Sequence, residues 1–381
     1  MDLAYVYCTG VPDGRGTFYS LPVVRMAKMF AETDDSVHVV AIGDLETASL
    51  EEHGATCHVY ERRLAFLGLL GFYLQLAYVV YRLDSRYRFD AVSNIWAHYH
   101  LLPVMVATWR FDTAVFARVF GQGNLWSRDR ANDPLDVKRP RRTALMVLVR
   151  FLNRYERRLL NAVHRVYTNS NGVRETLVGQ GVERSNVVVI SQGVDTTYFT
   201  PGDGEPRETL LFAGRLDSEN KRLDDAVRVF ESVQTVVPSA RFIVAGEGDP
   251  PPGLAERIAE NDGIEHRGFL KREAMREAYR EASVLVLTSE LEGVPNVILE
   301  AQACGTPVVA TDAGDVSRLL KNGGDVVMDR DIREMADQVV RILTDDDLRR
   351  SLGRQGRASV TEEHSLDRLA DSYRTLFTRT S

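Results

Sequence analysis

The second half of the chain alternates apolar runs with amphipathic segments. Three mostly apolar runs predict strands, and the last of them, which is continuous, suits a strand that is covered on both faces of a parallel sheet. They are Thr209–Ala213, Arg241–Ala245 and Ala282–Leu287. Residues 223–237 and 273–282 are predicted helices, and a further helix is expected at 362–380.

The stretch Ser289–Thr311 follows the last of these strands. It predicts a loop, a helix that stops near Gly305, and a further strand. Two carboxylates flank the helix start, with Glu292 in the loop and Glu300 inside the helix. Ligands of open α/β sheets bind at the carboxyl edge of the strands, so we place the chemistry here.

The first half of the chain begins and ends with the same kind of pattern. Leu3–Cys8 and Val37–Ile42 are the first predicted strands, and Arg165–Asn169 and Asn186–Ile190 are the last. A turn-rich linker follows at 191–208. The predicted fold class is therefore α/β, with two Rossmann-like parallel-sheet domains whose carboxyl edges face each other across a cleft.

A glycine-containing loop follows the first predicted strand. It carries Gly10, Gly14 and Gly16 but no G-x-G-x-x-G pattern, so an ordinary turn and a cradle for an anion both stay open. Asp44, after the second strand, would hold a ribose in a nicotinamide-binding alternative, which we consider the weaker hypothesis.

Composition narrows the class of protein. The chain has 381 residues, of which 44% are hydrophobic and 27% charged, as in a soluble globular protein. A net charge of −7 provides no global basic field for nucleic acid. The cysteines Cys8, Cys57 and Cys304 lie far apart, so neither a structural zinc site nor a disulfide framework is expected. The N-terminus does not resemble a signal peptide, and we expect a cytoplasmic protein.

Two segments of the first half suggest a membrane surface. Leu64–Val80 is free of charged residues but is short for a membrane span, so a core helix and a helix lying on the bilayer are the two main alternatives. Lys138–Arg158 is an amphipathic segment with one acid, Glu156, among many arginines. It is either a solvated basic face or a contact to anionic lipid.

His98 and His100 lie one residue apart in the first half. Two imidazoles without a third ligand make a poor metal site, so we favour structural roles for both.

The second half also supplies cations at a strand end. Arg215 and Lys221 follow a predicted buried strand, where they could neutralise a diphosphate without a metal. For Arg215 a surface ion pair is the alternative. The carboxylates Glu292 and Glu300 suit sugar hydroxyls instead, because a carboxylate accepts two hydrogen bonds from a vicinal diol. Together these groups indicate a nucleotide-sugar site.

The sequence resembles the family 4 glycosyltransferases of the GT-B fold. The resemblance rests on GRLDSENK, VAGEGD, VVVISQGVDTTYFTP and, above all, EGVPNVILEAQACGTPVVAT, which contains Glu292 and Glu300 as an E-x7-E element. It extends from about Arg165 to Val327 and is weak before that. The resemblance implies an acceptor domain at 1–195, joined by a C-terminal helix at about 364–381, and a nucleotide-sugar domain at 196–363.

The resemblance also implies roles for single residues. Arg215 and Lys221 would bind the diphosphate, Glu300 the ribose, and Glu292 the donor sugar; Arg215, Lys221 and Glu292 are the expected catalytic residues. The further expected donor ligands are Gly214, Gly246, Gly268, Leu270, Gly293, Val294, Pro295 and Asn296.

The sequence departs from the family pattern at several positions. Phe120 stands where many members have a histidine, and Gln192 replaces an asparagine of the linker. Gln122 and Asn124 are candidates to replace the histidine as hydroxyl ligands, and Gly14 and Gly16 belong to the expected acceptor-domain site.

The function that the resemblance implies is that of a retaining, metal-independent hexosyltransferase without a cofactor, in which the nucleotide sugar is a co-substrate. Its expected partners are a UDP- or GDP-sugar, a glycan or lipid-linked acceptor, and an anionic membrane surface at the inner face of the membrane. Two alternatives stay open: another GT-B enzyme, such as an epimerase or phosphorylase, and an inactive subunit that binds nucleotide sugar.

Overall fold

The computed structural model divides the chain into two compact units. Unit 1 contains residues 1–190 and 370–381, and unit 2 contains residues 191–369. The residues described are 2–8, 36–42, 51, 54–60, 68–95, 98–119, 154–204, 208–320, 324–327 and 331–378. The predicted boundary after residue 195 lies close to this division, and the functions assigned to the two domains stay predictions.

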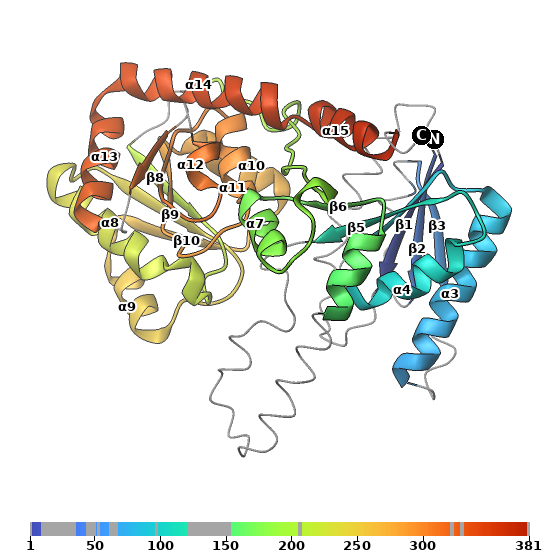
Figure 1. Ribbon diagram of the computed structural model, residues 1–381. Helices are drawn as coiled ribbons and strands as arrows, with labels where there is room; N and C mark the ends of the chain where they lie inside the picture. The colour runs from blue at the N-terminus through green and yellow to red at the C-terminus, as the bar shows by residue number, and fades with distance from the viewer. Residues whose placement is uncertain are drawn as a thin grey trace, which may run out of the picture. The chain divides into compact units, whose positions relative to one another are not determined.

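Unit 1 is built on a seven-stranded parallel sheet with the order β3-β2-β1-β4-β5-β6-β7 (Figure 1). The strands are β1 (Asp2–Cys8), β2 (Ser36–Ile42), β3 (Thr56–Tyr60), β4 (Ala91–Ile95), β5 (Ala114–Val119), β6 (Arg165–Thr168) and β7 (Val187–Val189). The helical segments are α3 (Gly68–Tyr87), α4 (His98–Thr108), α7 (Asn171–Gly179) and the short η2 (Arg184–Asn186). The strands predicted at β1, β2, β6 and β7 are confirmed to within a few residues.

The apolar segment at 64–80 is a core helix over its described part. Phe72, Leu76 and Val80 of α3 are buried in the core of unit 1. The opposite side of the same helix is exposed, so both interpretations of this segment have a physical basis. None of the helices in the described part of the chain is long and apolar enough to cross a membrane.

The last helix, α15 (Leu366–Thr378), covers aromatic residues of unit 1. Phe377 lies edge-on to Phe116, with ring centroids 4.8 Å apart, and Tyr373 lies edge-on to Tyr167 at 5.7 Å. All four rings are almost fully buried. Residues distant in sequence therefore complete the core of unit 1.

Unit 2 is built on a six-stranded parallel sheet with the order β10-β9-β8-β11-β12-β13 (Figure 1). The strands are β8 (Thr209–Ala213), β9 (Arg241–Ala245), β10 (Ile264–Gly268), β11 (Val284–Leu287), β12 (Val308–Thr311) and β13 (Gly324–Val327). The helical segments are η3 (Glu219–Lys221), α8 (Leu223–Val236), α9 (Pro252–Glu260), α10 (Arg272–Glu281), α11 (Asn296–Ala303), α12 (Val316–Leu319), α13 (Ile332–Thr344) and α14 (Asp346–His364).

The continuous apolar runs of unit 2 are central strands, as predicted. Every residue of β8, β11 and β12 is buried, because helices cover both faces of the sheet. The predicted helices at 223–237 and 273–282 correspond to α8 and α10. The prediction of one helix at 362–380 is wrong in its first part.

The helix predicted at 362–380 is interrupted at Ser365. Ser365 has an extended backbone between α14 and α15 and forms a parallel bridge with Val194. The Val194 N–H donates to the carbonyl of His364 at 2.8 Å, and the His364 ring lies 3.1 Å from the Gln192 carbonyl. These contacts with the linker replace helical hydrogen bonds at this point.

Candidate functional site

The order of the strands in unit 2 defines a switch point between β8 and β11. From β8 the chain adds β9 and β10 on one side of the sheet, and β11, β12 and β13 on the other. The loops that follow β8 and β11 therefore diverge at this point of the carboxyl edge. Such switch points are where open α/β sheets bind ligands.

Asn220 joins these two loops. Its side-chain amide donates to the Leu291 carbonyl at 2.8 Å and accepts from the Leu291 N–H at 2.9 Å. Its own carbonyl accepts from the Glu290 N–H at 2.9 Å. Asn220 was not among the predicted residues, because a pair of backbone contacts across 71 residues leaves no local pattern in the sequence.

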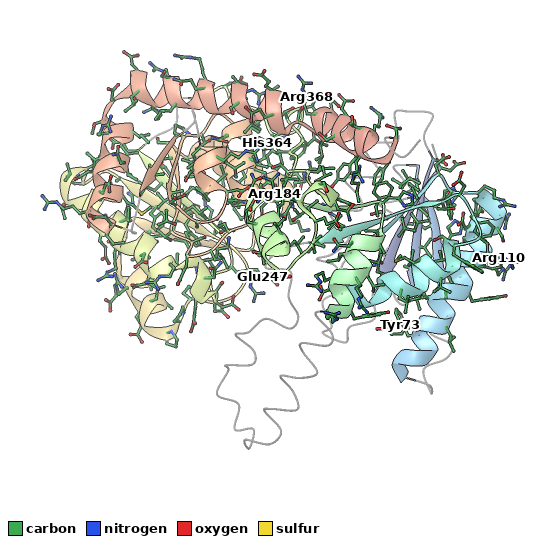
Figure 2. The ribbon with its side chains drawn as sticks, in the orientation of Figure 1. Tyr73, Arg110, Arg184, Glu247, His364 and Arg368 are labelled. Atoms are coloured by element: carbon green, nitrogen blue, oxygen red, sulfur yellow. The ribbon has the colours of Figure 1, made fainter. Side chains whose placement is uncertain are left out.

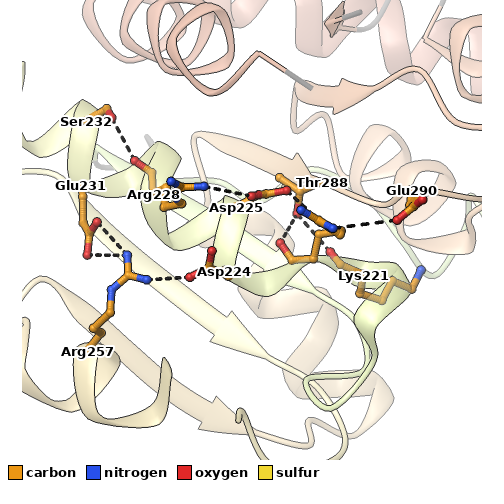
Figure 3. Close-up of polar contacts among 10 residues, drawn as sticks. Lys221, Asp224, Asp225, Arg228, Glu231, Ser232, Arg257, Thr288 and Glu290 are labelled. Atoms are coloured by element: carbon orange, nitrogen blue, oxygen red, sulfur yellow. Dashed lines mark hydrogen bonds and ion pairs between the residues drawn. The ribbon is translucent and has the colours of Figure 1, made fainter. Parts of the chain in front are cut away.

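Thr288, directly after β11, adds a second connection. Its hydroxyl lies 3.0 Å from the carbonyl of Lys221 and 2.9 Å from that of Arg222 (Figure 3). Arg222 has a left-handed backbone, with φ of 52°, at the start of α8. The turn that carries Lys221 is thus held by hydrogen bonds from the neighbouring strand end.

Lys221 and Glu292, predicted to bind different parts of a ligand, contact each other. The Lys221 ammonium nitrogen lies 2.5 Å from Glu292 Oε1. Their side chains are 21% and 10% exposed, so the pair is largely shielded from water. Removing one partner of a shielded ion pair costs more stability than removing one partner of a surface pair, because the other charge is left without compensation away from water. The structure therefore brings the predicted cation and carboxylate into one charged cluster.

Arg215 forms a forked ion pair with Asp217. Its Nε lies 3.1 Å from Oδ1 of Asp217, and a terminal nitrogen lies 2.9 Å from Oδ2. The hydrogen bonds that Arg215 donates to Asp217 raise the pKa of Arg215 above its usual range. Both side chains are more than two-fifths exposed, and exposed pairs contribute little stability. Arg215 is therefore accessible to an incoming anion.

Glu300 lies inside α11 and accepts a hydrogen bond from a buried tyrosine. The Tyr279 hydroxyl is 3.0 Å from Glu300 Oε2, and Tyr279 is fully buried. Burial, followed by the nearby Glu300 carboxylate, raises the pKa of the Tyr279 phenol well above its usual value. Tyr279 therefore stays a neutral donor and fixes the orientation of the carboxylate. Nothing in the sequence pattern marked this residue in advance.

Glycines allow the loops of this edge to approach one another. A Cβ atom on Gly246 would lie 1.6 Å from the carbonyl oxygen of Gly214, and the Gly246 N–H donates to the Gly268 carbonyl at 2.8 Å. Gly314 has a φ of 63°, and a Cβ there would lie 1.8 Å from the Glu292 carbonyl oxygen. A larger residue at either position would displace the loops.

The remaining predicted donor ligands lie along the same edge of unit 2. Leu270 is partly buried, Val294 and Pro295 are buried, and Asn296 is the first residue of α11. The Gly293 carbonyl accepts from the Asp315 N–H at 3.3 Å. Their roles as ligands stay predictions.

The predicted residues of unit 1 are only partly described. Gly14, Gly16, Gln122 and Asn124 lie outside the described residues, as do Gly10, Asp44 and most of the basic segment at 138–158. His98 and His100 lie in the first turn of α4.

The charged cluster of Lys221 and Glu292 does not coincide with the surface hollows of unit 2. One of these is lined by Thr209 and Arg241, at the amino ends of β8 and β9. It lies at the opposite edge of the sheet from Arg215 and Glu292, where strand order gives no reason to expect a ligand. Over the described ranges, no group of three or more His, Cys, Asp or Glu side chains could hold a metal ion.

Two family models match consecutive parts of the chain. The model described as Glycosyltransferase Family 4 matches residues 23–198, and the model described as Glycosyl transferases group 1 matches residues 207–345. The chain belongs to the family 4 glycosyltransferases. The charged cluster lies within the part matched by the group 1 model.

Curated relatives are about 30% identical to this chain over the parts that align. One is N-acetyl-alpha-D-glucosaminyl L-malate synthase from Bacillus anthracis, 30% identical over 161 residues, which are 41% of this chain and 42% of the relative. Another is D-inositol 3-phosphate glycosyltransferase from Mycolicibacterium smegmatis, 30% identical over 241 residues, which are 57% and 54% of the two chains. The chain thus spans about half the length of the curated relatives it matches.

Solved structures establish that this glycosyltransferase has the GT-B fold. Anabaena Alr3699/HepE in complex with UDP has a TM-score of 0.75 at 16% identity and full coverage of both chains. A glycosyltransferase from Rickettsia africae has a TM-score of 0.76 at 16% identity, with 99% and 98% of the two chains covered. At this identity the likeness shows the fold alone.

Proposed function

We propose that the protein transfers a sugar from a nucleotide diphosphate sugar to an acceptor, with retention of configuration and without a metal. The observation that carries this proposal is the shielded ion pair of Lys221 with Glu292, which joins the loops after β8 and β11 at the switch point of a chain that matches the family 4 glycosyltransferases. Anabaena Alr3699/HepE, a structural neighbour, has been solved in complex with UDP-glucose, which supports a donor of this class.

The cations suit the diphosphate. Arg215 can exchange its exposed partner Asp217 for phosphate oxygens, because its planar fork binds either anion with two hydrogen bonds. Lys221 carries three N–H donors, so it can bind a phosphate oxygen and keep its contact with Glu292.

The carboxylates suit hydroxyl groups. Glu292 and Glu300 would repel phosphate and accept hydrogen bonds from sugar and ribose hydroxyls. In the reaction, the bond between the anomeric carbon and the phosphate oxygen breaks, a bond to the acceptor oxygen forms, and the proton of the acceptor hydroxyl passes to the departing phosphate. Negative charge then grows on the departing diphosphate, and Arg215 and Lys221 stabilise it in the transition state.

An arginine substitution tests this assignment. We expect Arg215→Ala to lower the rate of transfer about 10²–10³-fold, as loss of one transition-state donor typically does. The matched control is Arg228→Ala on α8, which removes another exposed, ion-paired arginine of unit 2 away from the edge. The readout is nucleotide diphosphate released together with sugar attached to an added acceptor, which also separates transfer from epimerase chemistry. Unchanged transfer by Arg215→Ala would exclude the proposed role.

For the acceptor, we infer a lipid-linked glycan at the cytoplasmic face of a membrane. Support comes from α3 of unit 1, which has an uncharged first half and an exposed apolar side. A comparison of water-soluble and lipid-linked glycan acceptors tests it. Equal transfer to both classes would count against a lipid-linked substrate.

A further inference from the structure

Two neighbouring helices of unit 1 expose large apolar side chains. These side chains are Leu74 (53% exposed), Tyr78 (61%) and Tyr81 (40%) of α3, and Leu102 (42%), Val106 (56%) and Trp109 (76%) at α4. An isolated exposed apolar residue is ordinary, but six on two helices that pack together form a surface that calls for a partner. We name these six residues the α3–α4 surface.

The spacing of these residues places them in one line along each helix, with Trp109 in the turn directly after α4. Both lines follow the pattern i, i+4, i+7, which lies on one side of an α-helix. On α3 the other side is buried in the core. The ring of Tyr81 lies 5.5 Å from that of Phe111, which follows Trp109 in the chain. The two lines therefore approach each other at this end.

Charge is distributed unevenly around the α3–α4 surface. Residues 68–81 and 98–109 contain no Asp, Glu, Lys or Arg. Four exposed arginines follow where the lines approach each other: Arg82, Arg86, Arg88 and Arg110 (Figure 2 labels Arg110). Of the nearby acids, Asp84 is buried and accepts from the Thr113 hydroxyl at 2.8 Å, while Asp112 is exposed. The end of the surface is therefore mainly cationic.

An apolar face with aromatic residues and an arginine rim fits the boundary of a lipid bilayer. Trp and Tyr rings favour the interface between hydrocarbon and water, and arginines there attract anionic headgroups. A symmetric contact between two copies would bring four arginines of each copy toward only two exposed acids near this end, Asp90 and Asp112. Charge complementarity thus favours anionic lipid as the occupant.

We propose that the α3–α4 surface docks on a bilayer that contains anionic lipid, with the aromatic residues at the headgroup level. This inference deepens the proposed function by assigning the surface that would bring unit 1 to a lipid-linked acceptor. It uses none of the donor residues of unit 2, so the two proposals can be tested apart.

Vesicle flotation of the full chain tests the docking surface. We expect binding to phosphatidylcholine vesicles that contain phosphatidylglycerol, and weak binding to phosphatidylcholine alone. The triple variant Tyr78→Ser, Val106→Ser, Trp109→Ser should bind at least about tenfold more weakly, since it removes three of the large apolar side chains that the lipid would bury. The double variant Arg82→Glu, Arg86→Glu should lose the preference for anionic vesicles. Val236→Ser, at an exposed apolar residue of α8 in unit 2, is the matched control and should bind normally.

Two further readouts separate the possible outcomes. Transfer to a water-soluble acceptor should be unchanged in both variants, which also shows that they are folded. If the parent protein does not float, or the triple variant floats equally well, the docking proposal is wrong. A dimer that the triple variant converts to a monomer, without vesicle binding, would identify a second copy as the occupant. Loss of transfer in Arg215→Ala is independent of all these results.

Discussion

One hydrogen bond connects the core of unit 2 with its charged edge. Tyr279 is enclosed by the core, where its backbone carbonyl accepts from the Thr306 hydroxyl at 2.6 Å, and its phenol reaches Glu300. A carboxylate held in this way presents its lone pairs in a fixed direction. If Glu300 binds the ribose, Tyr279 is a positioning residue for that contact.

Replacing Tyr279 by Phe removes this donor and keeps the ring. We expect the KM for the donor to rise about tenfold with little change in kcat, because one hydrogen bond to a charged group is worth about 1.5–3 kcal/mol. Preference for the ribonucleotide over its 2′-deoxy form should also fall, which a merely structural role would not cause. The measurement is steady-state kinetics with both nucleotides.

The control for this variant is Tyr167→Phe in unit 1. It removes another buried hydroxyl, which lies 2.7 Å from the Ser93 hydroxyl, at a site remote in sequence from the donor loops. Similar kinetic changes in both variants would mean that Tyr279 has no special connection to the nucleotide.

At the residue scale, the sequence predicted the charged residues and missed their partners. Glu292 and Glu300 stand in a dense motif, and Lys221 follows a recognisable strand. Asp217, Asn220 and Tyr279 act through contacts that depend on how loops and helices meet in space. No periodicity or local composition records such contacts.

At the scale of elements, two neighbouring strands of unit 1 hold a pair of histidines. Nδ1 of His38 in β2 lies 3.0 Å from Nε2 of His58 in β3, and the rings are stacked. Such a contact needs an N–H on one ring and a lone pair on the other. Burial lowers the pKa of both, with smaller opposing effects from Asp2 on His38 and reinforcing effects from His38 and Arg86 on His58.

This pair makes unit 1 sensitive to acid. Because the folded-state pKa values lie below the ordinary value of about 6.5, the unfolded chain binds more protons below that pH. The contribution of the two histidines to the free energy of unfolding is therefore fully present above about pH 6.5. It declines as the pH falls from there through the folded-state pKa values. We expect the free energy of unfolding to drop between about pH 7 and pH 5, as measured by urea unfolding.

The double variant His38→Gln, His58→Gln should show a shallower dependence over the same range. His266→Gln, an exposed histidine of unit 2, is the control and should keep the dependence of the parent. Parallel curves for the parent and the double variant would rule out the histidine pair as the cause.

Of the strands that the sequence analysis did not predict, β4 and β5 lie inside the sheet of unit 1, and β3 and β10 lie at sheet edges. The edge strands β3 and β10 have partly or fully exposed residues throughout their described side chains. They therefore lack the apolar run that marks the buried strands β8 and β11. The break between α14 and α15 was also missed, since it depends on pairing with the linker.

At the scale of the whole molecule, each unit has its own hydrophobic core. One cluster of buried residues belongs to unit 1, and two belong to unit 2. We expect two thermal transitions. A nucleotide diphosphate at a hundredfold excess over Kd should stabilise unit 2 by about 2.7 kcal/mol. It should therefore raise the midpoint temperature of the unit 2 transition only.

Phe377→Ala assigns the transitions. It should lower the unit 1 transition, since removal of a buried phenylalanine costs about 3–5 kcal/mol. Calorimetry of both forms with UDP and GDP checks this. If the nucleotide instead raises the midpoint temperature of the transition that Phe377→Ala lowers, the ligand binds unit 1. The assignment of the donor site to unit 2 would then be wrong.

The place of α15 in the chain affects how the protein folds during synthesis. Phe377 and Tyr373 belong to unit 1, but the ribosome adds them only after the whole of unit 2. At about 5–20 residues per second, Phe116 and Tyr167 wait on the order of ten seconds for their aromatic cover. Unit 2, which is continuous in sequence, can complete its core first. Unit 1, which is synthesised first, therefore completes its core last. During that interval the nascent chain is a natural client for chaperones.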